Sequence, residues 1–444
     1  MSAIPGIAVF DIGKTNKKFF FFDEDYQIVE ETSQAFDETV DEDGFPCDDI
    51  RRLTEWMKDT LDVKLKDPRF LVKAINFSTY GASFVHLNGS GAVLTPLYNY
   101  LKPFPKELAA NFYPKYGGAE LFATETASPV LGNLNSGLQL YRIKEQQPEL
   151  FDQIKTSLHL PQYMGYLVHG ELFSDITSIG CHTALWNFNN NHYHRWVAAE
   201  GIGRKLAPVF SSKDTITATV NGVQLRCGVG LHDSSAAFIP YMQVIKESFI
   251  LLSTGTWCIS MNPFNRHSLT ARELAQDCLA YLTYNGSAVK SSRLFSGNEH
   301  EQEVKKLAEH FNVAPRYFHS IPYDPQLVDG NPDDAIVEVF QFSGSGTAEK
   351  AYHDLMLHLI KKQKRSTQLV LEDAPVKQLY VDGGFARNAI FMNLLAKAFP
   401  QLEVYAASVS QATAVGAALA IHSSWNAKDK IDHLVEVKRY RAGA

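Results

Sequence analysis

The segment 7–22, IAVFDIGKTNKKFFFF, constrains the fold of this chain more than any other segment. An apolar run reaches Asp11, and two lysines further on lead into four consecutive phenylalanines, so both flanks favour β-strand. The residues between the flanks favour a tight turn, and they are Gly13, Lys14, Thr15 and Asn16. The sequence therefore predicts a β-hairpin with a carboxylate beside its turn.

A second segment, FILLSTGTWCISM at 249–261, repeats this arrangement. Here an apolar strand meets Gly255 and Thr256, and another apolar strand follows. Glycine lets the backbone approach a ligand closely, and the N–H groups and hydroxyls of two such turns can bind one anion. The alternative is two ordinary buried hairpins without a ligand, because short turns of Gly and Thr are common.

The tripeptide Gly13-Lys14-Thr15 also occurs in P-loops, which need a second glycine five residues before Gly13 and a helix after Thr15. Ala8 occupies the position of that glycine, and β-favouring phenylalanines follow the turn. The sequence therefore argues against a P-loop.

A chain of 444 residues is too long for one hydrophobic core, so we expect two domains. We place the boundary between residues 240 and 246, which gives an N-terminal domain 1–243 and a C-terminal domain 244–444. The net charge of −7 and the lack of a basic cluster argue against binding to nucleic acid and favour a small-molecule partner. The sequence leaves a homodimer open.

Cysteine usage and the N-terminus indicate the compartment. The five cysteines have no CxxC spacing, which suits reduced thiols better than a disulfide framework or a zinc site. No basic region precedes the short apolar run at the N-terminus, and no apolar segment approaches the length of a membrane span. We therefore expect a soluble cytoplasmic protein that does not bind a membrane.

Periodicity and turn residues predict the elements around the two hairpins. In the first half we expect a surface loop in the acidic segment 37–49, helices at 50–63, 137–148 and 161–169, and a strand at 74–77 that leads to Gly81. In the second half we expect helices at 348–362 and 388–399, a strand at 378–381, and a closely packed, alanine-rich helix at 411–422. Gly383 and Gly384 lie between a strand and a helix, an arrangement that lets a nucleotide lie against the backbone.

Asp233 follows the predicted strand 223–229 and precedes an apolar helix, in the segment GLHDSSAA. The N–H groups and the dipole at a helix N-terminus favour a charged carboxylate in this position. These residues leave two interpretations open, a helix cap alone or a functional carboxylate.

Six segments together resemble the FGGY carbohydrate kinases of the actin-like ATPase superfamily, namely DIGKTNKK, STYGASFV, GLHDSSAA, LLSTGTW, DGGFARN and ATAVGAA. GLHDSSAAFIP and LLSTGTW are most similar to the rhamnulokinase-like branch. The resemblance covers nearly the whole chain. It implies an α/β protein of two ribonuclease H-like domains with the active site in the cleft between them.

The resemblance also implies an ATP-dependent sugar kinase that uses Mg²⁺, with L-rhamnulose or a related ketose such as L-fuculose or xylulose as its substrate. Asp233 matches the catalytic base, and Asp11 matches the aspartate that holds Mg²⁺, with Asp233 as a second metal-binding carboxylate. The positions that match phosphate-binding residues are Gly13, Lys14, Thr15, Asn16, Gly255 and Thr256. Gly383 and Gly384 match the adenosine loop, and Gly81, His232, Asp233 and Ser234 match positions that face the sugar.

Four residues depart from the family pattern. Lys14 occupies a position that a small residue often takes, Tyr141 stands near the usual tryptophan, Asn99 lies where a Trp-x-Asp sugar contact is common, and Gln411 replaces a glutamate. These departures leave the sugar open. They also keep two alternatives, a non-catalytic sugar or nucleotide sensor on the same fold and a chaperone or cytoskeletal ATPase of the superfamily.

Overall fold

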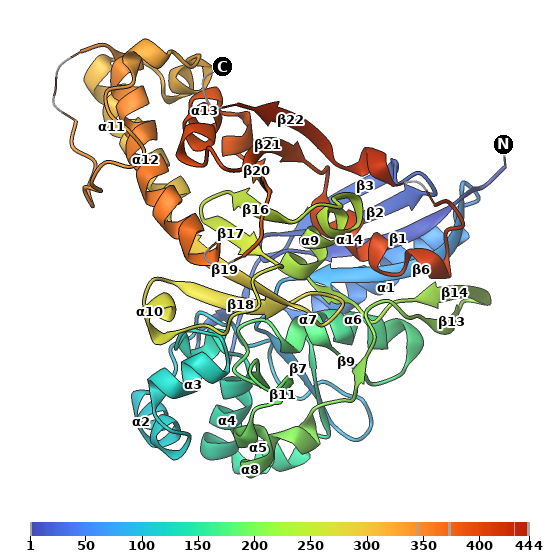
Figure 1. The fold of residues 1–444 in the computed structure, drawn as a ribbon. Helices are drawn as coiled ribbons and strands as arrows, with labels where there is room; N and C mark the ends of the chain where they lie inside the picture. Colours follow the sequence, from blue (N-terminus) through green and yellow to red (C-terminus); the bar gives the residue numbers. More distant parts are fainter. Residues whose placement is uncertain (1, 343, 345, 372–373, 430, 442–444) are drawn as a thin grey trace.

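A computed structural model describes residues 2–342, 344, 346–371, 374–429 and 431–441. It contains two α/β domains, each built on a seven-stranded sheet (Figure 1). This confirms the predicted class of a two-domain α/β protein.

The first sheet follows the order β13 (Ile216–Val220), β14 (Val223–Cys227), β6 (Phe70–Thr79), β1 (Ile4–Ile12), β2 (Asn16–Asp23) and β3 (Ile28–Ala35), with β15 (Leu231–His232) also beside β6. β1 and β2 pair antiparallel and form the predicted first hairpin. β1, β14 and β15 all run parallel to β6. The carboxyl ends of β1, β6 and β15 therefore lie at one edge of the sheet, where α/β proteins bind their ligands.

The four consecutive phenylalanines of β2 fill both faces of this sheet. Phe19 and Phe21 belong to the core beneath α1 (Ile50–Lys66) and α6 (Leu160–His169), and Phe20 and Phe22 belong to the core beneath α14 (Ala412–Ala420). All four side chains are fully buried. A strand that is covered on both faces has no reason to alternate apolar with polar residues.

The second sheet follows the order β18 (Cys278–Leu282), β19 (Ala288–Leu294), β17 (Cys258–Asn262), β16 (Phe249–Thr254), β20 (Gln378–Gly383), β21 (Glu403–Ser408) and β22 (Glu436–Tyr440). β16 and β17 pair antiparallel, which confirms the second hairpin. The helices α11 (Ser296–Phe311), α12 (Ala348–Leu371) and α13 (Ala389–Ala398) flank this sheet (Figure 1). The predicted helix 348–362 thus continues for more than two further turns.

Two helices cross between the sheets. α9 (Asp233–Val244) starts from β15 of the first sheet and packs through Phe238 and Tyr241 into the core of the second sheet. α14 comes from the C-terminal half of the chain and packs on β1 and β6 of the first sheet. The two helices lie side by side at Gly416, where an added Cβ would lie only 1.8 Å from the Ala236 carbonyl oxygen (Figure 1). The predicted close packing of the alanine-rich helix is therefore confirmed. α14 belongs to the C-terminal half of the chain but packs on the sheet of the N-terminal half.

Shorter helices and strands surround the first sheet and connect the two sheets. The helices are α2 (Lys106–Lys115), α3 (Ala119–Glu125), α4 (Gly137–Gln146), α5 (Pro148–Gln153), α7 (Ile176–Ile179), α8 (Arg195–Ala199) and α10 (Ala271–Leu274). The strands are β4 (Thr39–Val40), β5 (Pro46–Cys47), β7 (Phe84–Leu87), β8 (Thr156–His159), β9 (Ser174–Asp175), β10 (Trp186–Asn187), β11 (His192–Tyr193) and β12 (Val209–Phe210). An aromatic core around Phe112, Tyr141 and Trp196 holds α2, α4 and α8 together.

The acidic segment 37–49 is a surface loop only in part, so that prediction was wrong for three buried residues, Asp41, Cys47 and Asp48. Asp41 and Asp48 are buried, and each accepts hydrogen bonds from lysine, Asp41 from Lys102 at 2.6 Å and Asp48 from Lys17 at 2.8 Å. A carboxylate can be buried when a cation compensates its charge. Composition could not reveal these partners, because Lys102 lies far away in the sequence.

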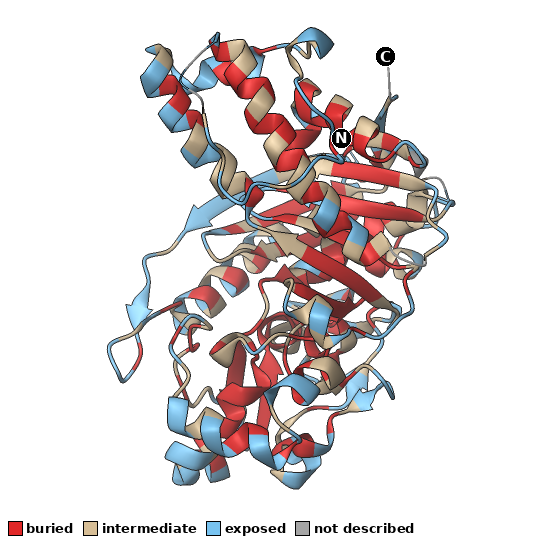
Figure 2. Ribbon diagram, turned by 60° about the vertical axis from the view of Figure 1, so that its left-hand side comes forward, coloured by how far each residue is buried: buried red, intermediate tan, exposed pale blue. Residues whose placement is uncertain are grey.

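Burial follows the two sheets. Buried residues line the strands and the helix faces turned toward them, whereas the outer helix faces are exposed (Figure 2). No helix among the described residues is long and apolar enough to cross a membrane.

Candidate active site

Asp11 and Asp233 lie at the same edge of the first sheet. In the strand register, Asp11 of β1 pairs with Ser78 of β6, and Ser78 also pairs with Leu231 of β15. Asp233 follows two residues after Leu231, at the first position of α9. The parallel strands therefore bring together two carboxylates that are separated by more than 200 residues in the sequence.

Asp233 does not cap its helix through its side chain. His232 occupies the N-cap position, and Asp233 is the first helical residue. Its Oδ1 accepts hydrogen bonds from the Ser234 backbone N–H at 2.6 Å and the Ser234 hydroxyl at 3.3 Å. Burial raises the pKa of Asp233 to about 6, and the two bonds from Ser234 oppose that shift. The structure therefore argues against the interpretation of Asp233 as a side-chain cap of α9.

Asp11 has a similar environment. Its Oδ2 accepts a hydrogen bond of 2.6 Å from the hydroxyl of Thr413, at the start of α14. Burial raises the pKa of Asp11 to about 6, the negative charge of Asp233 adds to the rise, and Thr413 and Lys18 oppose it. The two carboxylates therefore repel each other electrostatically. Paired carboxylate oxygens are suitable ligands for Mg²⁺, whose charge would relieve this repulsion.

The turn of the first hairpin lies beside Asp11. It is closed by a hydrogen bond of 2.9 Å from the Gly13 N–H to the Asn16 carbonyl oxygen. Thr15 and Asn16 are exposed at its tip. Both residues therefore lie where a ligand can reach them.

The side chain of Lys14 is bound to carboxylates. Its Nζ lies 2.6 Å from Asp48 Oδ2 and 2.9 Å from Glu38 Oε1. Asp48 also accepts hydrogen bonds from the buried Lys17 at 2.8 Å and from the Tyr80 hydroxyl at 2.7 Å. The position of Lys14 is thus explained by an ion-pair network beneath the turn, which joins the hairpin to the loop after β6.

Lys18 is a candidate that sequence reasoning missed. It pairs with Asp11 across the first hairpin, and its Nζ lies 3.2 Å from both Glu31 Oε1 and Gln411 Oε1. Counting the hairpin register back from the turn would have placed this cation opposite the carboxylate. Lys18 is partly exposed and can approach a bound anion.

The candidate sugar-side residues also adjoin Asp233. Gly81 lies against His232, since an added Cβ at Gly81 would lie only 2.3 Å from His232 Nε2. His232 Nδ1 lies 3.4 Å from Asp233 Oδ1. Ser234 is exposed next to them. Burial lowers the pKa of His232 to about 4, so its imidazole is neutral at physiological pH.

The second hairpin carries Gly255 and Thr256 at its tip. The turn is closed by a hydrogen bond of 2.9 Å from the Gly255 N–H to the Trp257 carbonyl oxygen. Thr256 is exposed. Its backbone carbonyl accepts a hydrogen bond of 3.2 Å from Asn298 in the first turn of α11.

The loop of Gly383 and Gly384 is hydrogen-bonded to the end of β16, the strand that leads into this hairpin. Thr254 O accepts a hydrogen bond of 2.8 Å from the Gly384 N–H, and Thr254 Oγ1 accepts one of 3.0 Å from the Phe385 N–H. Gly383 has φ +91°, and an added Cβ would lie 2.0 Å from the Thr254 carbonyl oxygen. Only glycine satisfies both conditions at this position.

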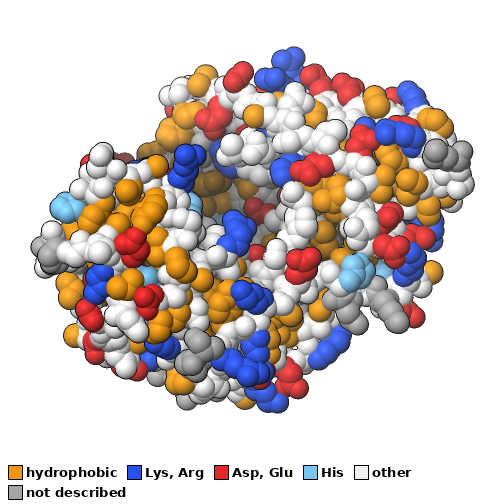
Figure 3. Space-filling view, turned by 90° about the horizontal axis from the view of Figure 1, so that it is seen from above, with side chains coloured by type: hydrophobic (Ala, Val, Ile, Leu, Met, Phe, Trp, Pro, Cys, Tyr) orange, Lys and Arg blue, Asp and Glu red, His pale blue; other side chains and the backbone are white. Residues whose placement is uncertain are grey.

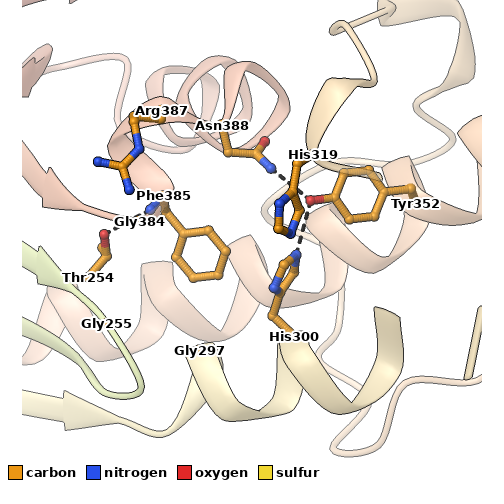
Figure 4. Close-up of a pocket in the computed structure, with 10 residues that line it drawn as sticks. All are labelled: Thr254, Gly255, Gly297, His300, His319, Tyr352, Gly384, Phe385, Arg387 and Asn388. Carbon is orange, nitrogen blue, oxygen red and sulfur yellow. Dashed lines mark hydrogen bonds between the residues drawn. The ribbon is translucent and has the colours of Figure 1, made fainter. Parts of the chain in front are cut away.

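A cavity of about 470 Å³ opens beside this loop and the second hairpin (Figure 4). The Tyr352 hydroxyl is bonded by His300 Nε2 at 3.0 Å and by Asn388 Nδ2 at 2.8 Å, and the ring of Phe385 projects toward the cavity (Figure 4). Aromatic and polar side chains together suit a flat heterocycle. The cavity is lined by Thr254, Gly255, Gly297, His300, His319, Tyr352, Gly384, Phe385, Arg387 and Asn388. No local motif predicted the cavity residues from α11 and α12, whereas four lining residues after β20 belong to the segment DGGFARN.

Helix α9 connects the two groups of residues. It carries Asp233 at its start, and eight residues later the Tyr241 hydroxyl donates a hydrogen bond of 2.5 Å to Asp382 Oδ2, immediately before Gly383. Eight residues of helix rise by about 12 Å. The surface is deeply hollowed near the middle of the molecule (Figure 3). Helix α9 and this hydrogen bond therefore join the edge that carries Asp233 to the loop of Gly383 and Gly384.

The other three departures from the family pattern also have structural partners. Tyr141 is buried beside Phe112, with 4.8 Å between the ring centroids. Asn99 is buried and donates a hydrogen bond of 2.9 Å to the Pro46 carbonyl oxygen. Gln411 has φ +52° and bonds Lys18. Tyr141 and Asn99 thus serve packing and loop structure.

Comparison with protein-family models gives three matches along the chain. The model described as the FGGY family of carbohydrate kinases, N-terminal domain, matches residues 7–237, more than half of the chain. A model of the carbohydrate kinase FGGY C-terminal domain matches residues 246–321, and a model of the C-terminal domain of the FGGY family of carbohydrate kinases matches residues 349–425.

Among curated proteins, a rhamnulokinase of Klebsiella pneumoniae is 25% identical over 232 residues, which are 50% of this chain and 46% of the relative. A rhamnulokinase of an Enterobacter species is 23% identical over 239 residues, which are 50% of this chain and 48% of the relative. The similarity thus spans about half the length of the curated relatives.

Solved structures share the fold over nearly the whole chain. A carbohydrate kinase from Novosphingobium aromaticivorans has a TM-score of 0.82 at 23% identity and covers 100% of this chain and 95% of its own. A xylulose kinase from Rhodospirillum rubrum has a TM-score of 0.81 at 15% identity, covering 98% and 94%. A glycerol kinase from Plasmodium falciparum with ADP has a TM-score of 0.74 at 14% identity, covering 98% and 92%. The actin-like ATPase fold is confirmed.

Proposed function

Because this chain belongs to the FGGY family of carbohydrate kinases, we propose that it transfers the γ-phosphoryl group of ATP to a hydroxyl group of a sugar. One observation carries the proposal. Asp11 and Asp233 share one edge of the first sheet, and α9 ties that edge to a glycine loop and a cavity suited to a heterocycle.

Asp233 is the proposed catalytic base. Its carboxylate accepts the proton of the sugar hydroxyl as that oxygen bonds to the γ-phosphorus and the bond from phosphorus to the ADP oxygen breaks. With a pKa of about 6, most of the Asp233 carboxyl groups are ionised at neutral pH. The loose transition state of phosphoryl transfer needs orientation more than a strong base. Ser234 holds one carboxylate oxygen through two hydrogen bonds and thereby orients the other.

The two hairpin turns are the proposed phosphate site. Backbone and hydroxyl groups of Gly13, Lys14, Thr15 and Asn16 lie on one side of the triphosphate, and those of Gly255 and Thr256 on the other. Lys18 adds a cation near Asp11. Donors that are fixed before the reaction stabilise developing charge without having to reorganise.

Asp11 and Asp233 are the residues that would hold Mg²⁺. A magnesium ion held there would supply positive charge against the phosphate oxygens. The mutual repulsion of the two carboxylates supports this assignment, because a divalent cation removes it. The nucleoside of ATP would lie against Gly383 and Gly384, with its base in the 470 Å³ cavity.

Gly81, His232 and Ser234 form the proposed sugar face beside the base. Glycine at position 81 leaves room for His232, whose neutral ring can both donate to and accept from sugar hydroxyls. L-Rhamnulose is our first candidate, because the relatives that match half of the chain are named rhamnulokinases. L-Fuculose and xylulose are the next candidates, since small changes in a hydroxyl-binding pocket change specificity.

The decisive experiment measures ADP release from ATP and Mg²⁺ across a panel of ketoses, aldoses and polyols, for the wild type and for Asp233→Asn. We expect release with at least one ketose and a loss of at least about 1,000-fold in Asp233→Asn, with ATP binding by calorimetry nearly unchanged. ATP binding without ADP release on any sugar would instead favour the non-catalytic sensor. Near wild-type turnover by Asp233→Asn would exclude this residue as the base.

A further inference from the structure

A cysteine and two histidines meet beside the proposed base, and two of them, Cys181 and His182, have no part in the proposed reaction. Cys181, His182 and His232 each offer a ligand atom, and these atoms all lie within 4.8 Å of one another. Cys181 and His182 follow α7, and His232 lies 50 residues later at the end of β15. Only the tertiary structure brings the three together, which explains why the cysteine spacing predicted no zinc site.

His182 is prepared to bind a cation. Its Nδ1 lies 3.3 Å from the Leu134 carbonyl oxygen, which can only accept a hydrogen bond. Nδ1 therefore carries the hydrogen, and Nε2 carries the lone pair. Burial lowers the pKa of His182 to about 3, so the ring stays neutral. A histidine whose second nitrogen is bonded to a carbonyl is typical of metal ligands.

His232 has an unsatisfied nitrogen. The side chain is 4% exposed, and its Nδ1 has no hydrogen-bond partner, although Asp233 Oδ1 lies 3.4 Å away. An unpartnered polar atom at this depth is unfavourable, because it has lost its hydrogen bonds to water. The rings of His182 and His232 lie edge to face, with 5.9 Å between their centroids. A cation between them would satisfy both lone pairs, and the nearby carboxylate would balance its charge.

The segment that holds Cys181 and His182 is fixed in a strained conformation. His182 has φ +42° and Ala184 has φ +62°, both in the left-handed region that disfavours side chains. Cys181 forms a β-bridge with Tyr281 of β18, and the Gly180 carbonyl accepts a hydrogen bond of 3.0 Å from the Leu282 N–H. Backbone strain of this kind is retained where surrounding structure imposes it, and it is concentrated at functional sites.

We propose that Cys181, His182 and His232 form a binding site for a borderline-soft divalent cation such as Zn²⁺, at the sugar side of the active site. Thiolate and imidazole ligands in a tetrahedral site select Zn²⁺ over Mg²⁺. Tetrahedral Zn²⁺ with bonds of about 2.0–2.3 Å needs ligand atoms about 3.5 Å apart, so any pair of these atoms that lies as far apart as 4.8 Å must come closer on binding. Burial raises the pKa of the Cys181 thiol, and on binding the metal displaces the thiol proton to solvent.

Three protein ligands leave the fourth position of the ion open. Since His232 belongs to the proposed sugar face, an ion bound to it would remove a sugar contact, and Zn²⁺ would inhibit the kinase by competition with the sugar. The inhibition rests on the proposed function, whereas the binding of the metal does not.

Binding is tested with Co²⁺ alone, in the absence of nucleotide and sugar. We expect the wild type to show a sulfur-to-cobalt charge-transfer band and the intense visible bands of four-coordinate cobalt, both removed by one equivalent of Zn²⁺. Cys181→Ser should lose the charge-transfer band and bind Zn²⁺ about 100-fold more weakly. Cys227→Ser is the matched control, because Cys227 is equally buried in the same domain and should leave the spectrum unchanged. Absence of the band in the folded wild type, or its survival in Cys181→Ser, would overturn the site.

Inhibition is tested with the sugar found by ADP release. Zn²⁺ should raise the KM for the sugar and leave the KM for Mg-ATP unchanged, whereas Cys181→Ser should phosphorylate the sugar normally and resist Zn²⁺. Equal inhibition of both proteins would overturn the competitive role. If no sugar is phosphorylated, the cobalt spectra still decide the metal site, so failure of the proposed function and failure of this site are distinguishable.

Discussion

At Asp233, burial and a short hydrogen bond from the next residue act in opposite directions on one carboxyl group. Burial prevails and raises the pKa from its ordinary value of 3.8 to about 6. The pKa of Asp11 is raised to about the same value. A raised pKa means that the folded protein favours the protonated form, so the stability that these groups contribute is present below pH 3.8 and is lost as the pH rises through about 6. The fold thus maintains two carboxylates at neutral pH at a cost in stability.

The pH dependence of the reaction should report these two groups. A base must be ionised, so kcat/KM for the sugar should be flat at neutral pH and fall toward acidic pH as Asp233 takes up a proton. Bound Mg²⁺ favours the charged carboxylates, so this fall should lie below the pKa of about 6 of the metal-free groups. Initial rates in buffers of constant ionic strength and saturating Mg²⁺ measure this profile. A rate that falls at no acidic pH at which the protein stays folded would exclude Asp233 as the titrating base.

Lys14 and Lys17 provide a matched pair of lysines on one carboxylate. Both bind Asp48, but the side chain of Lys14 is 26% exposed and that of Lys17 only 1%. We expect Lys14→Met to lower the free energy of unfolding by about 1 kcal/mol and to leave the KM for ATP within about twofold. Lys17→Met should cost about 3–5 kcal/mol, because it removes a buried partner of a buried charge. Denaturant unfolding and ATP kinetics check both variants, and a tenfold rise in the KM for ATP of Lys14→Met would instead indicate that Lys14 reaches the phosphates.

At the scale of single elements, the close contact between α9 and α14 fixes the position of each helix. They pass so closely at Gly416 that no side chain fits there, since an added Cβ would lie 1.8 Å from Ala236 O. Each helix also carries a residue of the site near its start, Asp233 on α9 and Thr413 on α14. The spacing of the two helices therefore sets the geometry of both carboxylates.

Gly416→Ala should disturb stability and activity together. We expect a loss of at least about 2 kcal/mol in the free energy of unfolding, because the new methyl group must push α14 away from the α9 backbone, and a lower kcat because Thr413 and Asp233 move apart. Gly89→Ala is the control, since a Cβ there meets no atom within 4 Å, and it should change stability by less than about 0.5 kcal/mol. Urea unfolding and sugar-dependent ADP release measure both effects. Wild-type stability in Gly416→Ala would contradict this close packing.

At the scale of the whole molecule, the proposed site draws residues from both domains, although each domain has its own sheet. The hydrogen bond between Tyr241 and Asp382 crosses from α9 to the loop after β20 and so couples the proposed base to the proposed nucleotide site. Ligands in clefts between domains favour closed conformations that exclude water, which protects a γ-phosphate from hydrolysis. We expect the glycine loop to respond to changes at Tyr241 although this side chain is buried away from the cavity.

Tyr241→Phe removes the hydroxyl group, and with it this hydrogen bond, and keeps the buried ring. We expect the KM for ATP to rise by about tenfold or more, as for the loss of a hydrogen bond to a charged group, while the KM for the sugar changes less than about twofold. Steady-state kinetics with each substrate varied in turn make the comparison. Tyr281→Phe is the control, since Tyr281 is another buried tyrosine but bonds the sulfur of Met261. A rise in the sugar KM alone would show that Tyr241 acts on α9 and not on the loop.

Local patterns in the sequence determined the two hairpins, the helix that starts at Asp233, the glycine loop and the alanine-rich helix, because turns and periodic burial depend on neighbouring residues. Lys18 could have been placed opposite Asp11 from the hairpin register alone. The tertiary structure alone decided which distant groups meet: the carboxylate partners of Lys14, the histidine, tyrosine and asparagine of the cavity, and the cluster of Cys181, His182 and His232. These contacts depend on how sheets and helices pack. Packing joins segments that lie far apart in the sequence, and no periodic pattern in the sequence shows which of them meet.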